Sequence, residues 1–223
     1  LAEYGAYPER PWTADMVLAG VSYAILTFRF DTDVFTGPPR VRFEIDGPPL
    51  YDIRADSTAG GSGAQRWADP STWTRTRNPA VMIWNILRGV AFPDGSVWGF
   101  GLEAADIDQA SFVAAMNDCD AAVALAGGGT QPAYQAGYEV MGADEPADVV
   151  EALLKACGGR IAESAGRVLR RVGPPGLPVA SFTDGDVAVS RPGDYAPFPS
   201  LEQVWNGVQA SYPEPASLWE PKD

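Results

Sequence analysis

The apolar stretch at residues 80–87 predicts the most strongly buried helix of the chain. Asn78-Pro79 precedes it and Gly89 follows it. Asn is a good N-cap and Pro is favoured at the first helical position, while Gly ends helices. Apolar residues lie almost all round this helix, so we expect neighbours to cover it on several sides.

Two further stretches predict helices. One begins at a cap at Asp108 and continues through SFVAAMNDC, and the other begins at Pro146 and ends at Gly158-Gly159. The second of these is amphipathic, with residues three and four apart on one apolar face. That face comprises Val149, Val150, Leu153, Leu154 and Cys157.

Alternating or β-branched and aromatic residues predict strands elsewhere. We expect turns at Asp46-Gly47-Pro48-Pro49, at Ser164-Ala165-Gly166 and at Asp184-Gly185-Asp186. Ser200 and Gln203 resemble a capping box, although the stretch from 204 to 215 is equally compatible with a strand. The predicted strands cover residues 16–31, 40–46, 50–53, 134–141, 160–172 and 179–189.

Polar, glycine-rich segments separate these elements. Residues 55–77 and 90–106 are predicted to be loops, and residues 121–132 a flexible exit from the second helix. Glycine and proline together number 44 of the 223 residues. This content indicates many turns and short elements.

Composition excludes several function classes. The chain has no histidine, so it has no Ser-His-Asp triad, no Cys-His pair and no imidazole metal ligand. Its formal charge of −13 disfavours nucleic acid and anionic membrane surfaces, which bind through Lys and Arg. No run of about 18 apolar residues predicts a transmembrane helix. The first residues carry no signal-peptide pattern and no initiator Met, so we expect a segment of a longer protein.

Pairs of carboxylates are the first candidates for chemistry, because a glycosidase uses two acids that face each other across a sugar. The simpler interpretation is structural: Asp at turns bonds local backbone, and Asp at a helix start is favoured by the helix dipole. None of the pairs belongs to a D-x-[DN]-x-[DN]-G sequence, so the chain has no EF-hand-type calcium loop. The pairs are Asp31 with Asp33, Asp106 with Asp108, Asp118 with Asp120, and Asp184 with Asp186.

Glycines and tryptophans are the next candidates. Residues 99–104 fit G-x-G-x-x-A, but neither a buried strand before them nor a helix start supports dinucleotide binding. Glycine runs at 59–63 and 126–129 lack the ending of a phosphate loop. Trp84 is expected in the core, whereas loop tryptophans suit interface anchoring better than sugar stacking. These loop tryptophans are Trp67, Trp73 and Trp98.

Cys119 and Cys157 are expected to be two buried small hydrophobic residues. They form no CxxC pair and cannot close a zinc site. The sequence leaves open whether these two cysteines form a disulfide.

Several segments, in order, resemble the central tail hub and host-attachment protein of long-tailed phages, the J-type protein, and the related large hub protein of gene transfer agents. The resemblance covers about residues 17–223. Asn85 or Trp84 stands where that family commonly has an acidic residue, and Met116 alters one motif, both at packing positions. The matching segments are GVSYAILTFRFD, VRFEIDGPPLYDIR, TRNPAVMIWNILRG, IDQASFVAAMNDCD, EPADVVEALLKACGGRIAESAGRVLRRVG and VWNGVQASYPEPASLWEPKD.

The resemblance implies an α+β fold of β-rich hub modules with short inserted helices. Residues 1–56 would be part of a β-rich hub module, and 57–130 a loop-rich segment with two helices. Residues 131–196 would form a small α+β module, and 197–223 a segment that returns to the hub sheet and is truncated.

The function that the resemblance implies is structural. We expect a homotrimeric hub that closes the distal tail of a phage-like particle, with no catalytic residue, no cofactor and no metal. Its partners would be the distal tail protein, the tape measure and minor tip proteins, and other domains would reach a host receptor. It would be assembled in the host cytoplasm and located in the virion. The alternative is a domain that binds or cleaves host-surface glycans, for which Asp106, Asp108, Asp184 and Asp186 are the candidate acids.

Overall fold

A computed structural model describes residues 22–26, 28, 33, 37, 39–92, 94–173, 177–186, 205–217 and 219–222. The chain divides into two compact units, residues 1–44 and 45–223. Within the first unit, none of the described residues belongs to a helix or a strand. The strand predicted for 16–31 is therefore wrong for 22–26 and 28, and that for 40–46 is wrong throughout. An alternating pattern favours a strand, but it does not by itself supply the neighbouring strand to which a strand must be hydrogen-bonded.

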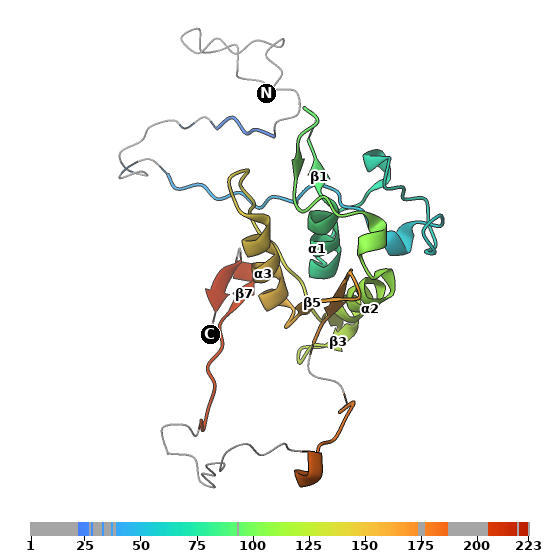
Figure 1. Cartoon of the computed structure of the whole chain (residues 1–223). Coiled ribbons are helices and arrows are strands. Elements are labelled where there is room, and N and C mark those ends of the chain that lie inside the picture. The colour runs from blue at the N-terminus through green and yellow to red at the C-terminus, as the bar shows by residue number, and fades with distance from the viewer. Residues whose placement is uncertain are drawn as a thin grey trace. The chain divides into compact units, whose positions relative to one another are not determined.

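The second unit contains three helices and four two-stranded antiparallel sheets among its described residues (Figure 1). The α+β class is thus confirmed. The helices are α1 (Pro79–Arg88), α2 (Gln109–Asp120) and α3 (Pro146–Ala156). The sheets pair β1 (Val90–Ala91) with β2 (Val97–Trp98), β3 (Ala122–Ala124) with β4 (Thr130–Pro132), β5 (Arg160–Ser164) with β6 (Arg167–Arg171), and β7 (Tyr212–Glu214) with β8 (Glu220–Lys222).

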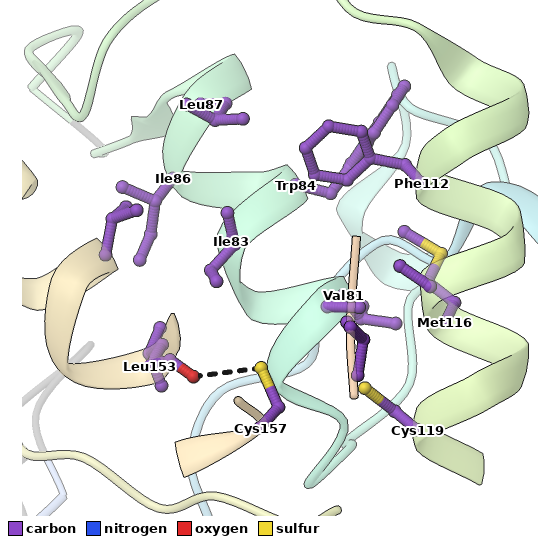
Figure 2. Close-up of a cluster of buried hydrophobic side chains, with 14 of the residues drawn as sticks. Val81, Ile83, Trp84, Ile86, Leu87, Phe112, Met116, Cys119, Leu153 and Cys157 are labelled. Atoms are coloured by element: carbon purple, nitrogen blue, oxygen red, sulfur yellow. Dashed lines mark hydrogen bonds between the residues drawn. The ribbon is translucent and has the colours of Figure 1, made fainter. Parts of the chain in front are cut away.

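Helix α1 is the centre of the hydrophobic core, as its sequence predicted. The Asn78 side chain accepts hydrogen bonds from the amides of Ala80 and Val81, and Gly89 closes the other end with a positive φ of 90°. Figure 2 shows side chains from α1, α2 and the α3 region meeting around it. Eight of the ten residues of α1 are buried, because α2 and α3 both pack against it.

Helices α2 and α3 also begin and end where the sequence predicted. The Asp108 carboxylate caps α2 by accepting from the amide of Ser111 at 2.7 Å. Phe112 and Met116 turn toward α1, and Trp84 meets the Phe112 ring edge-on at 5.4 Å. Helix α3 places Val149, Val150 and Leu153 in the same core, and Gly158 ends it. Elements from both sides of residue 130 therefore share one core.

The hairpin β5–β6 confirms the two strands predicted around Ala165-Gly166, with Arg160 opposite Arg171. The exit from α2 contains an unpredicted hairpin, β3–β4, in place of a flexible loop. Two other strand predictions are wrong over their described residues, since 134–141 and 179–183 are in no strand. In the predicted strand 50–53, Leu50 pairs with Thr74 in an isolated antiparallel bridge, and Ile53 begins the 3-10 helix Ile53–Ala55. The predicted capping box of Ser200 and Gln203 lies outside the described residues.

Candidate functional site

The loop from Asp56 to Ala64 is built around one buried carboxylate. Asp56 accepts hydrogen bonds from the hydroxyl of Tyr51 at 2.8 Å and from the hydroxyl and amide of Thr58 at 2.6 and 2.8 Å. The Arg66 guanidinium forms an ion pair with this carboxylate, with its Nη1 3.0 Å from the Oδ1 that also accepts from Thr58. The glycine-rich segment that the sequence predicted to be a loop is therefore tied to the core at its base.

The electrostatics of this carboxylate follow from its donors. The hydrogen bond from the Thr58 hydroxyl does most to lower the pKa of Asp56 to about 2, helped by Tyr51, the Thr58 amide and Arg66. Burial of the carboxylate acts in the opposite direction. The pKa of the Tyr51 hydroxyl is raised, chiefly by burial and then by its bond to Asp56. Asp56 therefore stays ionised and anchors the loop.

A groove of about 300 Å³ lies between this loop and α2. Its polar groups come from Arg54, Ser62, Gln109 and Asn117 and from the backbone of Gly60 and Gly61. Gly61 lets the loop approach closely, since a Cβ there would lie 2.3 Å from the Arg54 carbonyl oxygen. The full lining comprises Ile53, Arg54, Gly60, Gly61, Ser62, Gln109, Val113 and Asn117.

The charge of Arg54 in this groove is already neutralised. Its guanidinium lies 2.6 Å from Asp52 and 2.7 Å from Asp120, and it donates to Asn117 at 3.0 Å. The hydrogen bond to Asp52 is the largest cause of the raised pKa of Arg54, which therefore keeps its charge. The groove thus offers amide, hydroxyl and backbone hydrogen bonds, which suit a neutral polar ligand better than an anion.

Three carboxylates of the predicted pairs serve local backbone, as the structural interpretation expected. Asp106 accepts from the amide of Glu103 at 3.0 Å, and Asp108 caps α2. Asp186 accepts from the amide and hydroxyl of Thr183, both at 2.8 Å. These carboxylates hold turns and a helix start.

The remaining pairs have different surroundings. Asp120 is bound to Arg54, whereas its neighbour Asp118 is exposed at the end of α2. Asp33 is exposed, and Asp31 lies outside the described residues. Hence the structure does not bring Asp118 and Asp120 to a common partner.

Trp67, Trp73 and Trp84 pack within the chain. Trp84 is buried in the core, as predicted. The Trp67 ring is contacted by the Arg88 guanidinium at 4.6 Å, by Trp73 at 5.4 Å and, edge-on, by Tyr51 at 5.3 Å. A tryptophan that stacks on a sugar needs an exposed ring face, whereas the Trp67 ring is surrounded by these three side chains.

Trp98 and the glycines after it allow the chain to pack closely against the end of α1. The Trp98 indole donates to the carbonyl oxygen of Asp144 at 3.1 Å. Gly99 has a φ of 124°, and a Cβ there would lie 2.3 Å from the carbonyl oxygen of Ile86. The G-x-G-x-x-A segment thus lets the chain cross the end of α1, where the Phe100 amide donates to that same carbonyl.

Sequence reasoning missed one charged residue in the core. Arg170 in β6 is only 4% exposed, and its Nη2 donates to the Sγ of Cys157 at 3.0 Å. Cys119 and Cys157 are both buried and unbridged, which confirms the prediction of two buried thiols. Side chains alternate between the two faces of β6, and this alternation could have placed Arg170 on the inward face. A strand with several arginines, however, is normally predicted to be exposed.

Within the described part of the chain, no group of three or more acidic or cysteine side chains is placed to hold a metal ion. Over the same residues, none of the helices has the length and apolar character needed to cross a membrane. Comparison with protein-family models and with curated proteins finds no match to this chain.

Proposed function

We propose that this chain is a structural part of a phage-like tail tip, within a trimeric central hub that closes the distal tail and links it to host attachment. The observation that carries the proposal is the ordered series of segments, over about residues 17–223, that resemble the J-type hub protein. It is thus a proposal about assembly, and it assigns no catalytic role to any residue.

Exposed apolar side chains outside the core support an assembly role. Phe182 and Trp205 are 84% and 85% exposed, and Leu177, Val179 and Val208 are exposed to a similar extent. Exposed apolar surface of this kind is typical of regions that a partner covers. Val41, Phe43 and Ile45 are exposed and alternate with polar residues, a pattern suited to pairing with a strand of a neighbouring chain.

The net negative charge of the chain limits which surfaces can form the interfaces of a trimer. Three chains with a formal charge of −13 bring −39 together. Electrostatic repulsion between the three copies is lowest if the carboxylates face solvent, a lumen or basic partners. We therefore expect few carboxylates in the interfaces between copies. The apolar residues above are the better candidates for those interfaces.

Immunoelectron microscopy tests the location. Antibodies against this chain should label the distal tail tip of particles from cells that encode it. Mass photometry of the full parent protein should give a trimer. Absence of the chain from tailed particles, or a parent protein that stays monomeric within the intact assembly, would refute the proposal.

A second candidate function is binding of a neutral host-surface glycan. The observation that favours it is the groove lined by Gln109, Asn117 and Gly60–Ser62, whose hydrogen-bonding groups suit hydroxyl-rich ligands. A glycan array should then give a signal that Asn117→Ala abolishes and that exposed Asp118→Asn leaves unchanged. A uniformly blank array would remove this candidate.

A further inference from the structure

Three residues from separate elements meet in the core. Cys119 is near the end of α2, Cys157 directly follows α3, and Arg170 is in β6. Both thiols are completely buried, and the Arg170 side chain is buried with them. Figure 2 shows the two cysteine side chains beside α1, among apolar neighbours. This arrangement does not depend on the proposed function.

The Arg170 guanidinium lacks an ordinary counter-ion. Its Nε and Nη1 atoms are buried without a hydrogen-bond partner, and its ion pairs with carboxylates are absent from the part of the chain that the structure describes. The Phe112 ring lies 6.0 Å from the guanidinium carbon and is an incomplete substitute for an anion. Arginine does not lose its proton in proteins, so a buried guanidinium requires a negative charge nearby.

Among the described residues, one side-chain acceptor reaches this guanidinium. Nη2 donates to the Sγ of Cys157 at 3.0 Å, and the charged or titratable groups that act on Arg170 are Cys157 from the α3 region and Cys119 from α2. Helix α1 contributes apolar side chains to the same place. We propose that Cys157 is held as a thiolate, the buried counter-ion of Arg170, while the neighbouring Cys119 stays a neutral thiol.

A neutral Cys157 is the competing state. Its Sγ lies 3.2 Å from the carbonyl oxygen of Leu153, the contact that a thiol makes when it donates to the preceding helical turn (Figure 2). Such a donation is weak, because S–H is a poor donor. An uncompensated guanidinium in the core costs far more than this bond contributes, so the ion pair is the favoured state.

The two thiols differ in their surroundings. The neighbouring Cys119 thiol does most to lower the pKa of Cys157, and the charge and hydrogen bond of Arg170 lower it further, against the effect of burial. The proximity of Cys157, together with burial, raises the pKa of the Cys119 thiol. Because the Arg170 guanidinium donates to Cys157 at 3.0 Å, Cys157 is the sulfur that carries the charge.

Raman spectroscopy of the S–H stretching band tests this in the intact chain. At neutral pH the folded protein should show one thiol of its two, and acidification should restore the second before the fold is lost. Cys119→Ser should remove the remaining band, whereas Cys157→Ser should leave it. Two full S–H bands in the folded protein at neutral pH would overturn the proposal.

Variants of Arg170 supply a second readout. Arg170→Met keeps most of the apolar volume and removes the charge, so both S–H bands should appear at neutral pH. If this variant fails to fold, titration of thiolate absorbance in the wild-type chain decides the matter without it. If neither thiol of the wild-type chain ionises below the ordinary cysteine range, the ion pair is contradicted.

Discussion

The Asn85 side chain pairs with the backbone of Tyr51 as a second strand would. Its Oδ1 accepts from the Tyr51 amide at 3.1 Å, and its Nδ2 donates to the Tyr51 carbonyl oxygen at 2.8 Å. The same Nδ2 donates to the carbonyl of Val81 at 2.8 Å. A polar residue in the middle of the apolar helix α1 is thus fully hydrogen-bonded, and it fixes the entry of the chain at Tyr51 to the core.

Asn85→Asp should destabilise the fold. An aspartate keeps the acceptor for the Tyr51 amide but cannot donate to either carbonyl, and it buries a charge. We expect a loss of about 2–4 kcal/mol in the free energy of unfolding, measured by urea denaturation at neutral pH. Asn117→Asp is the matched control, because Asn117 is exposed and accepts from Arg54. An equal loss in both variants would contradict the role of Asn85.

Asp56 should give the fold an acid-sensitive component. Its pKa is about 2 in the folded protein, below its ordinary value of 3.8. A lowered carboxyl pKa stabilises the fold above the unfolded value, so this contribution is present at neutral pH and is lost as the pH falls from about 4 toward 2. Asp56→Asn should flatten the loss of stability over that range in pH-dependent denaturation.

Thr58→Val tests the cause of the Asp56 shift. It removes the hydroxyl that contributes most to lowering the pKa. The acid transition should therefore move to higher pH, whereas Thr58→Ser, which keeps a hydroxyl, should restore it. The exposed Asp118→Asn serves as the control, and a similar effect of this variant would contradict the assignment to Asp56.

Gly99→Ala should weaken the contact between the β2 region and α1. The added Cβ meets the Ile86 carbonyl oxygen, and the backbone has a positive φ of 124°. Strain of this kind costs about 1–3 kcal/mol before the steric clash is counted. Gly137→Ala is the control, because open space surrounds that position. Thermal unfolding should show a lower Tm for the first variant only.

The ion pair of Cys157 and Arg170 predicts a second pH dependence. Because the Cys157 pKa is lowered on folding, its contribution is complete above the unfolded thiol pKa of about 8.5 and decreases as the pH falls through the folded value. Arg170→Met should abolish this slope. Its stability at low pH should equal or exceed that of the wild type, since replacing a buried ion pair by apolar groups is often neutral or stabilising.

Apolar residues of the core and of the exposed segments should respond differently to substitution. Trp84→Ala removes a buried ring and should cost about 3–5 kcal/mol. Trp205→Ser changes an exposed ring and should alter stability by no more than about 0.5 kcal/mol. If the exposed ring contacts a second copy, Trp205→Ser should weaken trimer formation in mass photometry. An unchanged trimer would remove Trp205 from the interface.

The three helices were predictable because their signals are local. Asn78, Asp108 and Gly89 each cap an end by bonds to residues a few positions away, and the apolar spacing sets the buried face. The β5–β6 hairpin is local for the same reason, since Ala165-Gly166 provides the turn between paired strands. Side-chain type and short-range spacing are enough to specify such elements.

Contacts between segments that are far apart in the sequence could not be predicted from local patterns. The alternation in 41–45 is typical of a strand, but a strand forms only when a partner lies alongside it. The G-x-G segment after Trp98 could have been a ligand loop until its distance from the Ile86 carbonyl showed a packing role.

The local pattern of this chain thus determined its helices, its caps and one hairpin. Tertiary structure alone decided that Asn85 completes the backbone of Tyr51 and that Asp56 gathers its donors. It also decided that Arg170 meets Cys157 at 3.0 Å. The partners in these contacts lie in separate elements or at different positions of one loop. Whether a buried polar group finds a hydrogen-bond partner there depends on interatomic distances that are set only when the chain folds.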